Sequence, residues 1–173
     1  MSFELSLKGR ARLFGDDVNT DYIISSRRKR DARDEREMMR FLFEDIDPAF
    51  AASIEPDDIL VAGKNFGCGS AMEVAVTVPR AAGIRAVVAK SFARTFYRNA
   101  INNGLLPVIA DTDGIKEGEP VEIATAQGST FVVLGNGAHR IPAHGVPPEL
   151  VSIFIEGGLV PYLAKHRGFV AIE

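Results

Sequence analysis

The chain has 173 residues, of which 46% are hydrophobic and 25% are charged. This is enough to bury one core, and we expect a single domain over residues 1–173. The formal net charge of −3 gives no excess of positive charge, so nucleic acid and anionic membranes are disfavoured as partners and a small polar substrate is favoured. No apolar stretch approaches the roughly 20 residues that cross a bilayer, and the N-terminal segment lacks the order of a signal peptide, which predicts a cytoplasmic protein.

Short elements are predicted in the first third of the chain. Alternating apolar residues indicate a strand or a bent hairpin over residues 3–14, and a turn follows over residues 15–21. Residues 25–36, SSRRKRDARDER, are polar and mostly charged, which indicates a solvated loop. Apolar residues within 38–43 predict a short helix, and Asp47-Pro48 has the pattern of a cap and first residue of another helix.

The middle of the chain alternates between strands and helices. Short apolar runs predict strands over residues 59–62, 84–89 and 105–109. Helices are predicted between them over residues 70–82 and 91–102, the second with its first residue, a serine, as the cap. Because crossover connections are right-handed, these three strands are expected to be parallel neighbours.

From residue 121 onward the pattern changes to that of antiparallel structure. Strands are predicted over residues 121–124 and 130–134, joined by Gln-Gly and followed by an Asn-Gly turn, and a final helix follows Pro148. The predicted fold class is therefore α/β, with a mixed sheet whose centre is parallel and whose C-terminal strands are antiparallel.

The sequence contains one cysteine, Cys68. It rules out an internal disulfide, and a single thiol cannot hold an iron–sulfur cluster, which needs about three or four protein thiolates. His139 and His144 lie in turn-like sequence without an accompanying set of ligands, so no metal site is predicted. Any cluster that this protein uses is expected to belong to another chain.

The glycine-rich stretch GKNFGCGSAMEVAV brings a flexible backbone and a hydroxyl to a predicted helix start. Gly67 and Gly69 allow a ligand to approach the backbone closely, and helix-start amides favour an anion. Ser70 and Glu73 also have the spacing of a capping box, so Ser70 either caps its helix or faces a ligand. Cys68 has no base nearby in the sequence, which favours a small, partly buried thiol over a nucleophile.

Several segments together resemble the small subunits of 3-isopropylmalate dehydratase and homoaconitase. They are Asn-Thr-Asp-Tyr-Ile-Ile at 19–24, Gly-Cys-Gly-Ser with its following Glu at 67–73, and the pair AKSFAR and YRNAINNG within 89–104. The resemblance covers roughly residues 8–160. It implies a swivelling β/β/α domain, similar to the mobile C-terminal domain of aconitase, that closes over a [4Fe–4S] cluster carried by a large subunit.

The activity implied by this resemblance is the removal and re-addition of water on a hydroxy di- or tricarboxylic acid. The closest match in function is 3-isopropylmalate dehydratase, which would place the chain in leucine biosynthesis. The chain itself would hold no cofactor and would act only with its iron–sulfur large subunit. Apolar surface that awaits this subunit would favour homo-oligomers of the isolated chain.

In the family pattern, the serine that follows Gly-x-Gly is the base that removes a proton from the substrate, and Ser70 matches it. A serine alkoxide is unfavourable in water, so a site closed to solvent must stabilise it. The resemblance also implies a set of substrate-binding positions: Thr20, Asp21, Arg30, Gly67, Cys68 and Gly69.

Two residues depart from the family pattern beside Ser70. Ala71 replaces a second serine, and Met72 replaces an arginine that in the family contacts a substrate carboxylate. Loss of this cation would cost about 2–4 kcal/mol unless another group replaced it. Lys64 and Arg94 are the candidates, and a structural ion pair is the favoured role for Arg94.

The basic segment at 25–36 corresponds to the family's substrate-recognition loop. Isopropylmalate enzymes tend to place apolar residues there and tricarboxylate enzymes an arginine, and Arg30 aligns with that arginine. Guanidinium groups suit a carboxylate through paired hydrogen bonds, which favours a charged substrate tail. A loop that is basic only to remain solvated is the alternative.

Three other functions remain open at this stage. One is a homoaconitase- or citramalate-type isomerase subunit. Another is a non-catalytic binding subunit that kept the fold after losing the arginine at position 72. The last is a self-contained cysteine enzyme built on Cys68, for which the sequence offers no identifiable base.

Overall fold

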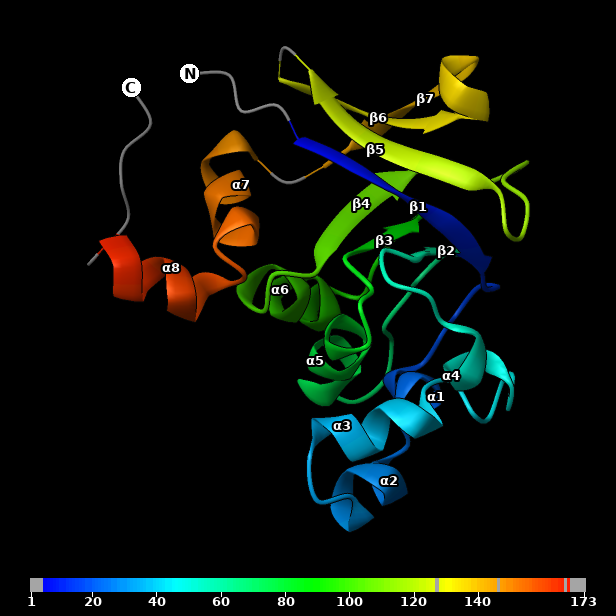
Figure 1. Cartoon of the computed structure of the whole chain (residues 1–173), viewed down its shortest axis with the longest axis vertical. Coiled ribbons are helices and arrows are strands. Elements are labelled where there is room, and N and C mark those ends of the chain that lie inside the picture. The colour runs from blue at the N-terminus through cyan, green and yellow to red at the C-terminus, as the bar shows by residue number, and fades with distance from the viewer. Residues whose placement is uncertain (1–4, 127, 146, 167, 169–173) are drawn as a thin grey trace.

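The computed structural model describes residues 5–126, 128–145, 147–166 and 168. Its strands form a closed barrel in the order β1-β2-β3-β4-β7-β6-β5 (Figure 1). The strands are β1 (Leu5–Leu13), β2 (Ile59–Ala62), β3 (Ala86–Ala89), β4 (Leu106–Ala110), β5 (Pro120–Ala126), β6 (Ser129–Leu134) and β7 (His139–His144). The α-helices are α1 (Thr20–Ile23), α2 (Ser26–Asp31), α3 (Glu35–Met38), α4 (Phe50–Ser53), α5 (Val74–Ala81), α6 (Arg94–Asn102), α7 (Pro148–Ile155) and α8 (Leu159–His166), with 3₁₀ turns η1 (Met39–Phe41) and η2 (Gly135–Gly137).

Strands β1 to β4 form the parallel part of the barrel, with β1 beside β2, β2 beside β3 and β3 beside β4. Strands β5, β6 and β7 pair antiparallel, and they close the barrel through β1 on one side and β4 on the other. The predicted parallel centre and antiparallel C-terminal strands are confirmed. Closure of the sheet into a barrel was not predicted.

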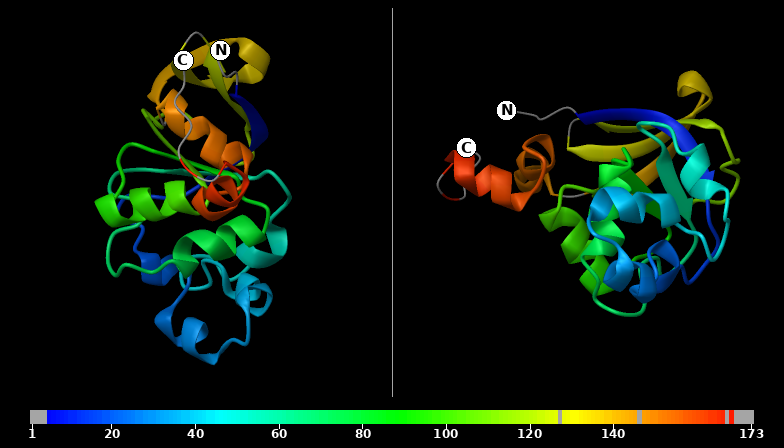
Figure 2. Two further views of the ribbon diagram at one scale, coloured as in Figure 1. Left: turned by 90° about the vertical axis from the view of Figure 1, so that its left-hand side faces the viewer. Right: turned by 60° about the horizontal axis from the view of Figure 1, so that its bottom comes forward.

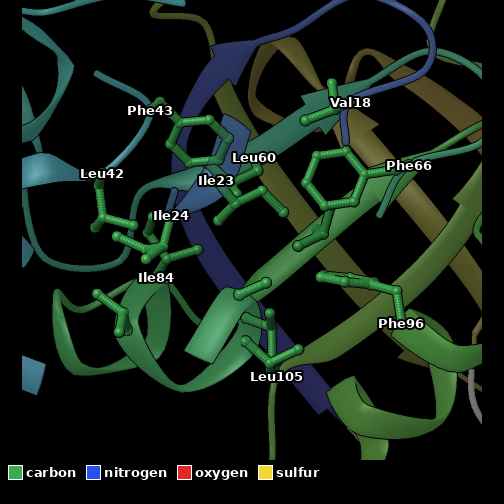
Figure 3. Packing of buried hydrophobic residues seen from close by; sticks show 14 of the residues in the cluster. Val18, Ile23, Ile24, Leu42, Phe43, Leu60, Phe66, Ile84, Phe96 and Leu105 are labelled. Atoms are coloured by element: carbon green, nitrogen blue, oxygen red, sulfur yellow. The ribbon is translucent and has the colours of Figure 1, made fainter. Parts of the chain in front are cut away.

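Strands β2 and β3 are buried along their whole length, as expected of parallel strands covered on both faces. Successive side chains of a strand point to opposite faces of the sheet. In β2 and β3, the side chains on one face therefore belong to one hydrophobic core and those on the other face to a second core. Leu60 (Figure 3) and Val87 join the core that packs under the helices. Val61 and Val88 join the core inside the barrel, to which every strand contributes.

Helices α1 to α4 gather at the end of the molecule opposite strands β5 to β7 (Figures 1 and 2). The predicted solvated loop over residues 25–36 is wrong, because α2 and α3 lie there. Each helix is capped by a side chain: the Ser25 Oγ accepts a hydrogen bond from the Arg28 amide, and the Asp34 Oδ1 accepts one from the Glu37 amide. These caps supply order that the polar composition did not suggest.

The two central helices begin later than predicted. Helix α5 starts at Val74 rather than at Ser70, and its N-cap residue, Glu73, makes no capping hydrogen bond, so the Ser70–Glu73 capping box does not form. Helix α6 starts at Arg94, because the Ser91 hydroxyl accepts a hydrogen bond from the Asn65 amide instead of capping the helix.

The remaining outcomes concern α4, the C-terminal elements and the length of the helices. Helix α4 starts at Phe50, two residues beyond the predicted Pro48, although the Asp47 Oδ1 does accept a hydrogen bond from the Ala49 amide. The predicted helix after Pro148 is confirmed as α7, and α8 follows it without having been predicted. Strand β7 replaces the expected turn around His139. None of the described helices is long and apolar enough to cross a membrane.

A closed polar network lies at the start of β2. The Asp58 side chain is 1% exposed. It accepts hydrogen bonds from the Arg10 Nε at 3.0 Å and from the Arg12 Nη1 at 3.1 Å. Arg12 also donates to the Ser53 Oγ at 2.8 Å and to the Glu117 Oε1 at 2.9 Å. The network ties β1 to the segment that enters β2.

Candidate active site

Three loops meet at the carboxyl ends of the parallel strands β1, β2 and β3. The loop after β2 pairs with the segment after β1 through Asn19 and Cys68, and with the segment after β3 through Phe66 and Phe92. The Thr20 amide donates to the Cys68 carbonyl at 2.8 Å. Ligands of α/β sheets bind at this edge, so the junction of the three loops is the candidate site.

Both glycines of the Gly-Cys-Gly sequence are required by their surroundings. Gly67 has a φ of +78°, and a Cβ there would lie 2.2 Å from the Phe96 Cγ. Gly69 has a φ of +91°, and a Cβ there would lie 2.4 Å from the Asn19 Oδ1. That oxygen caps α1 by accepting a hydrogen bond from the Asp21 amide at 2.9 Å. The loop therefore reaches its position only with glycine at both places.

Ser70 is exposed, and its hydroxyl makes no hydrogen bond with any described residue. Its backbone carbonyl accepts a hydrogen bond from the Thr20 Oγ1 at 2.8 Å. Thr20 is 2% exposed, so this contact is sheltered from water. The main chain of Ser70 is fixed while its hydroxyl stays available, and its capping role is excluded because α5 begins at Val74.

The backbone amides next to Ser70 are also available. Among the described residues, no backbone carbonyl or side chain accepts a hydrogen bond from the amide of Gly69, Ser70 or Ala71. Adjacent unpaired amides form a concave donor site for anions. The hydroxyl and the donors therefore lie on the same short loop.

Met72 turns into the core instead of toward this loop. Its side chain is 5% exposed and belongs to the core under the helices. Its Sδ lies 3.7 Å from the Ser26 Oγ. Ser26 in turn donates to the Asp21 Oδ1 through both its amide, at 3.0 Å, and its hydroxyl. Position 72 therefore links the loop to α1 and α2, and it supplies no cation.

Helix α2 carries a group of cations, Arg27, Arg28, Lys29 and Arg30. Arg28 is paired with Glu44, and Arg30 has a side chain that is 76% exposed and lies 3.4 Å from Asp31. Arg27 and Lys29 are exposed and form no ion pair within the described part of the chain. The hydrogen bond from Arg28 lowers the pKa of Glu44, so this pair is charged at neutral pH.

The two cations proposed to replace the missing arginine are both exposed. Neither Lys64 nor Arg94 has a side-chain ion pair in the regions that the structure covers. The structural ion pair expected of Arg94 is therefore not formed there. Lys64 lies in the loop after β2, where its amide donates to the Asp16 Oδ1 at 2.6 Å.

Sequence reasoning missed the positioning roles of Asn19 and Ser26. Asn19 caps α1 and fills the space beside Gly69. Ser26 joins Asp21 to Met72. The Asn-Thr-Asp string has the composition of a helix start, and this signal could have identified the cap.

The side chains present do not form a ligand set for an iron–sulfur cluster. Within the described ranges, no group of three or more His, Cys, Asp or Glu residues is placed to hold a metal ion. Cys68 is a free, partly exposed thiol, and it is the one cysteine of the sequence.

The chain is similar in sequence to proteins of a known family. A family model described as the aconitase C-terminal domain matches residues 21–113. The 3-isopropylmalate dehydratase small subunit 2 of Archaeoglobus fulgidus is 44% identical over 162 residues, which is 94% of this chain and 97% of that protein. The methanogen homoaconitase small subunit of Methanocaldococcus jannaschii is 45% identical, with 93% of each chain covered.

The chain belongs to the 3-isopropylmalate dehydratase and homoaconitase small-subunit family. The crystal structure of a 3-isopropylmalate dehydratase from Methanocaldococcus jannaschii superposes with a TM-score of 0.86 at 45% identity, covering 94% of this chain and 96% of that one. The family resemblance and the predicted β/β/α fold class are thereby confirmed. Relatives of similar identity carry both names, so overall similarity does not decide between the two reactions.

Proposed function

We propose that this chain is the small subunit of a heteromeric hydro-lyase in the cytoplasm. The complex would remove and re-add water on a hydroxy di- or tricarboxylic acid, as 3-isopropylmalate dehydratase does in leucine biosynthesis. The observation that carries the proposal is the exposed Ser70 hydroxyl, which no described residue engages, on a loop whose backbone is fixed by Thr20. The hydroxyls of Ser53 and Ser91, in contrast, are engaged in hydrogen bonds within the chain.

Ser70 acts in this proposal as the base that removes a proton from the carbon next to the hydroxyl-bearing carbon. Its alkoxide would be stabilised by the unpaired amides of the same loop, because fixed dipoles in a site closed to water stabilise charge strongly. Thr20 would hold the Ser70 backbone in place. Gly67, Cys68 and Gly69 would line the approach of the substrate, and Asp21 would act through Ser26 and Met72.

The partner in this proposal is a large subunit that carries a [4Fe–4S] cluster. When bound, the cluster would supply a Lewis acid for the leaving hydroxyl. The small subunit contributes the base, the anion-binding loop and the exclusion of water on closure. A chain with one cysteine depends on its partner for the cluster.

A second substrate class is favoured by α2. Met72 is buried and supplies no cation, whereas α2 carries several cations, of which Arg30 is exposed. An arginine against an isopropyl group would lose its hydration without gaining a partner, whereas a carboxylate would accept paired hydrogen bonds. This favours a homoaconitase-type substrate, which carries an additional carboxylate, over isopropylmalate.

The test is co-expression of the chain with its candidate large subunit, followed by assays of water loss from isopropylmalate, citramalate, homocitrate and citrate. We expect activity with at least one of these acids and a loss of about 10³-fold or more in the Ser70→Ala complex. A folded complex that is inactive on all four would contradict the proposed function and favour the non-catalytic binding subunit. An active Ser70→Ala complex would contradict the assignment of the base alone.

A further inference from the structure

Helix α2 has no hydrophobic face to pack against the rest of the molecule. It has six residues, and none of them is buried. A helix of this length does not persist on its own in water, because nucleation costs more than a few hydrogen bonds return. Its position beyond α1 and α3 (Figure 1) is therefore fixed from outside the helix, by the buried Ile24 before it, by Ala32 after it, which packs against the core, and by polar contacts of its own side chains.

The strongest of these contacts is made by Arg28. Its Nε donates to the Glu44 Oε1 at 2.7 Å and its Nη2 to the Glu44 Oε2 at 2.9 Å. The centre of its guanidinium group lies 3.7 Å from the centroid of the Phe41 ring. Paired hydrogen bonds and stacking on an aromatic face together define both the position and the plane of a guanidinium group.

The partners of Arg28 stand on a rigid part of the molecule. Between Phe41 and Glu44 lie Leu42 and Phe43, which are both fully buried in the core under the helices (Figure 3). Phe43 stacks on Phe14 with ring centroids 4.3 Å apart. Arg28 therefore fastens α2 to a segment that is itself anchored.

The other side of α2 contacts α1 and the segment that follows Ser70. Ser26 contacts Asp21 and Met72, and Met72 lies two residues after Ser70. Residues of an α-helix are about 100° apart around the axis, so Arg30 lies about 40° from Ser26 and about 160° from Arg28. Holding Arg28 against Phe41 and Glu44 thus keeps Arg30 on the same side of the helix as Ser26.

We propose that Arg28 is a positioning residue that sets the substrate selectivity of the complex. Through Phe41 and Glu44 it fixes the rotation of α2, and this rotation presents Arg30 to the distal carboxylate of the substrate. The inference rests on the proposed function. Arg28 does not itself contact the substrate, because two of its nitrogens and one face of its guanidinium group are already engaged.

The experiment uses the complex with the large subunit and compares Arg28→Met, Arg28→Lys and Glu44→Gln with wild type. The kcat and KM values are measured for homocitrate, which has a distal carboxylate, and for isopropylmalate, which has none. We expect both Arg28 variants to raise KM for homocitrate about tenfold with kcat nearly unchanged, and to leave KM for isopropylmalate within about twofold. Lysine fails because it can neither stack as a plane nor form the paired hydrogen bonds.

Glu44→Gln keeps the size of the side chain but weakens the Arg28–Glu44 contact. It is therefore expected to raise KM for homocitrate as the Arg28 variants do. The double variant Arg28→Met with Glu44→Gln should be no worse than either single variant, since both remove one shared interaction. Arg40→Ala is the matched control, because Arg40 is an exposed arginine of the same region whose side chain has no partner among the described residues. It should leave both KM values unchanged.

Results other than those expected would contradict either the positioning role of Arg28 or the proposed function. If Arg28→Lys keeps the wild-type KM for homocitrate, or Glu44→Gln has no effect, the positioning role is overturned. If the wild-type complex is active and every variant has the same KM values for homocitrate and isopropylmalate as wild type, the positioning role fails and the proposed function stands. If the wild-type complex is inactive on all the hydroxy acids, the proposed function fails and the selectivity role fails with it.

Discussion

The two ends of strand β2 carry polar side chains that are used in opposite ways. At its start, Asp58 is buried and its carboxylate accepts hydrogen bonds from Arg10 and Arg12. At its end, the Ser70 loop is exposed, and its hydroxyl and amides have no partners among the described residues. Four buried residues separate these arrangements.

This difference shows how the fold separates stability from chemistry. Polar groups that are fully paired in a buried place hold the chain together and have nothing left to offer a ligand. Polar groups left unpaired at a solvent-exposed edge cost little and remain available for a substrate. Substitutions at the two ends are therefore expected to affect different measurements.

The largest effect on stability is expected from Asp58→Asn. The change removes the buried carboxylate that Arg10 and Arg12 share and leaves Arg12, which is also buried, paired with Glu117 alone; breaking a buried ion pair costs about 3–5 kcal/mol. Chemical denaturation should report this loss in the free energy of unfolding. Asp57→Asn is the control, since Asp57 is exposed and should change stability by less than about 0.5 kcal/mol. Equal effects at the two positions would contradict the closed network.

A smaller loss in the free energy of unfolding is expected from Gly67→Ala. The added Cβ meets the Phe96 ring, and the positive φ adds a further cost, so the sum is about 2–3 kcal/mol. Gly114→Ala is the matched control, because Gly114 has a similar φ of +87° and nothing within 4 Å of the added atom. It should cost about 1 kcal/mol. Thermal unfolding of both variants separates the clash from the backbone strain, and equal shifts in Tm would show that the contact with Phe96 contributes nothing.

The next effect depends on pH. Burial by itself would raise the pKa of Asp58, but the hydrogen bonds from Arg10, from the Glu55 amide and from Arg12 outweigh it and hold the pKa below its ordinary value. Because the folded-state pKa is lowered, the stabilisation is present above the ordinary pKa of about 4 and is lost as the pH falls through the lower folded value.

The wild-type Tm should therefore fall between about pH 5 and pH 3, and Asp58→Asn should reduce this fall because it removes the titrating group. Differential scanning calorimetry across this range measures both. Glu44, whose pKa is lowered by Arg28, also contributes to the loss of stability at low pH. Its contribution should remain in the Asp58→Asn variant as a smaller dependence of Tm on pH. An identical pH dependence in the two proteins would contradict the assigned role of Asp58.

The sequence predicted those parts of the fold that depend on local patterns. The buried runs of β2, β3 and β4 and the helices between them follow from apolar periodicity. Strand β7 was missed because within HRIPAH only Ile141 is buried, so the segment lacks the apolar alternation of a strand. It forms by pairing with β6, which precedes it across η2.

The sequence singled out the loop of the candidate site but not the geometry of that loop. The string Gly-Cys-Gly-Ser identified the loop, yet the capping-box spacing suggested a helix start at Ser70. The Ser70 carbonyl is bonded by Thr20, 50 residues earlier in the chain, and the helix begins at Val74. In the same way, the ordering of α2 by Arg28 depends on Phe41 and Glu44, which a window around residues 25–36 does not include.

The most direct test compares Ser70→Ala with Ser53→Ala in the complex with the large subunit. The Ser53 Oγ accepts a hydrogen bond from Arg12 and donates one to the Phe50 carbonyl, so its loss should cost about 1–2 kcal/mol of stability and leave turnover per folded complex unchanged. Ser70→Ala should leave the free energy of unfolding within about 0.5 kcal/mol of wild type and abolish turnover. A Ser70→Ala complex that turns over like wild type, or a loss of turnover that only follows a loss of stability, would contradict the account.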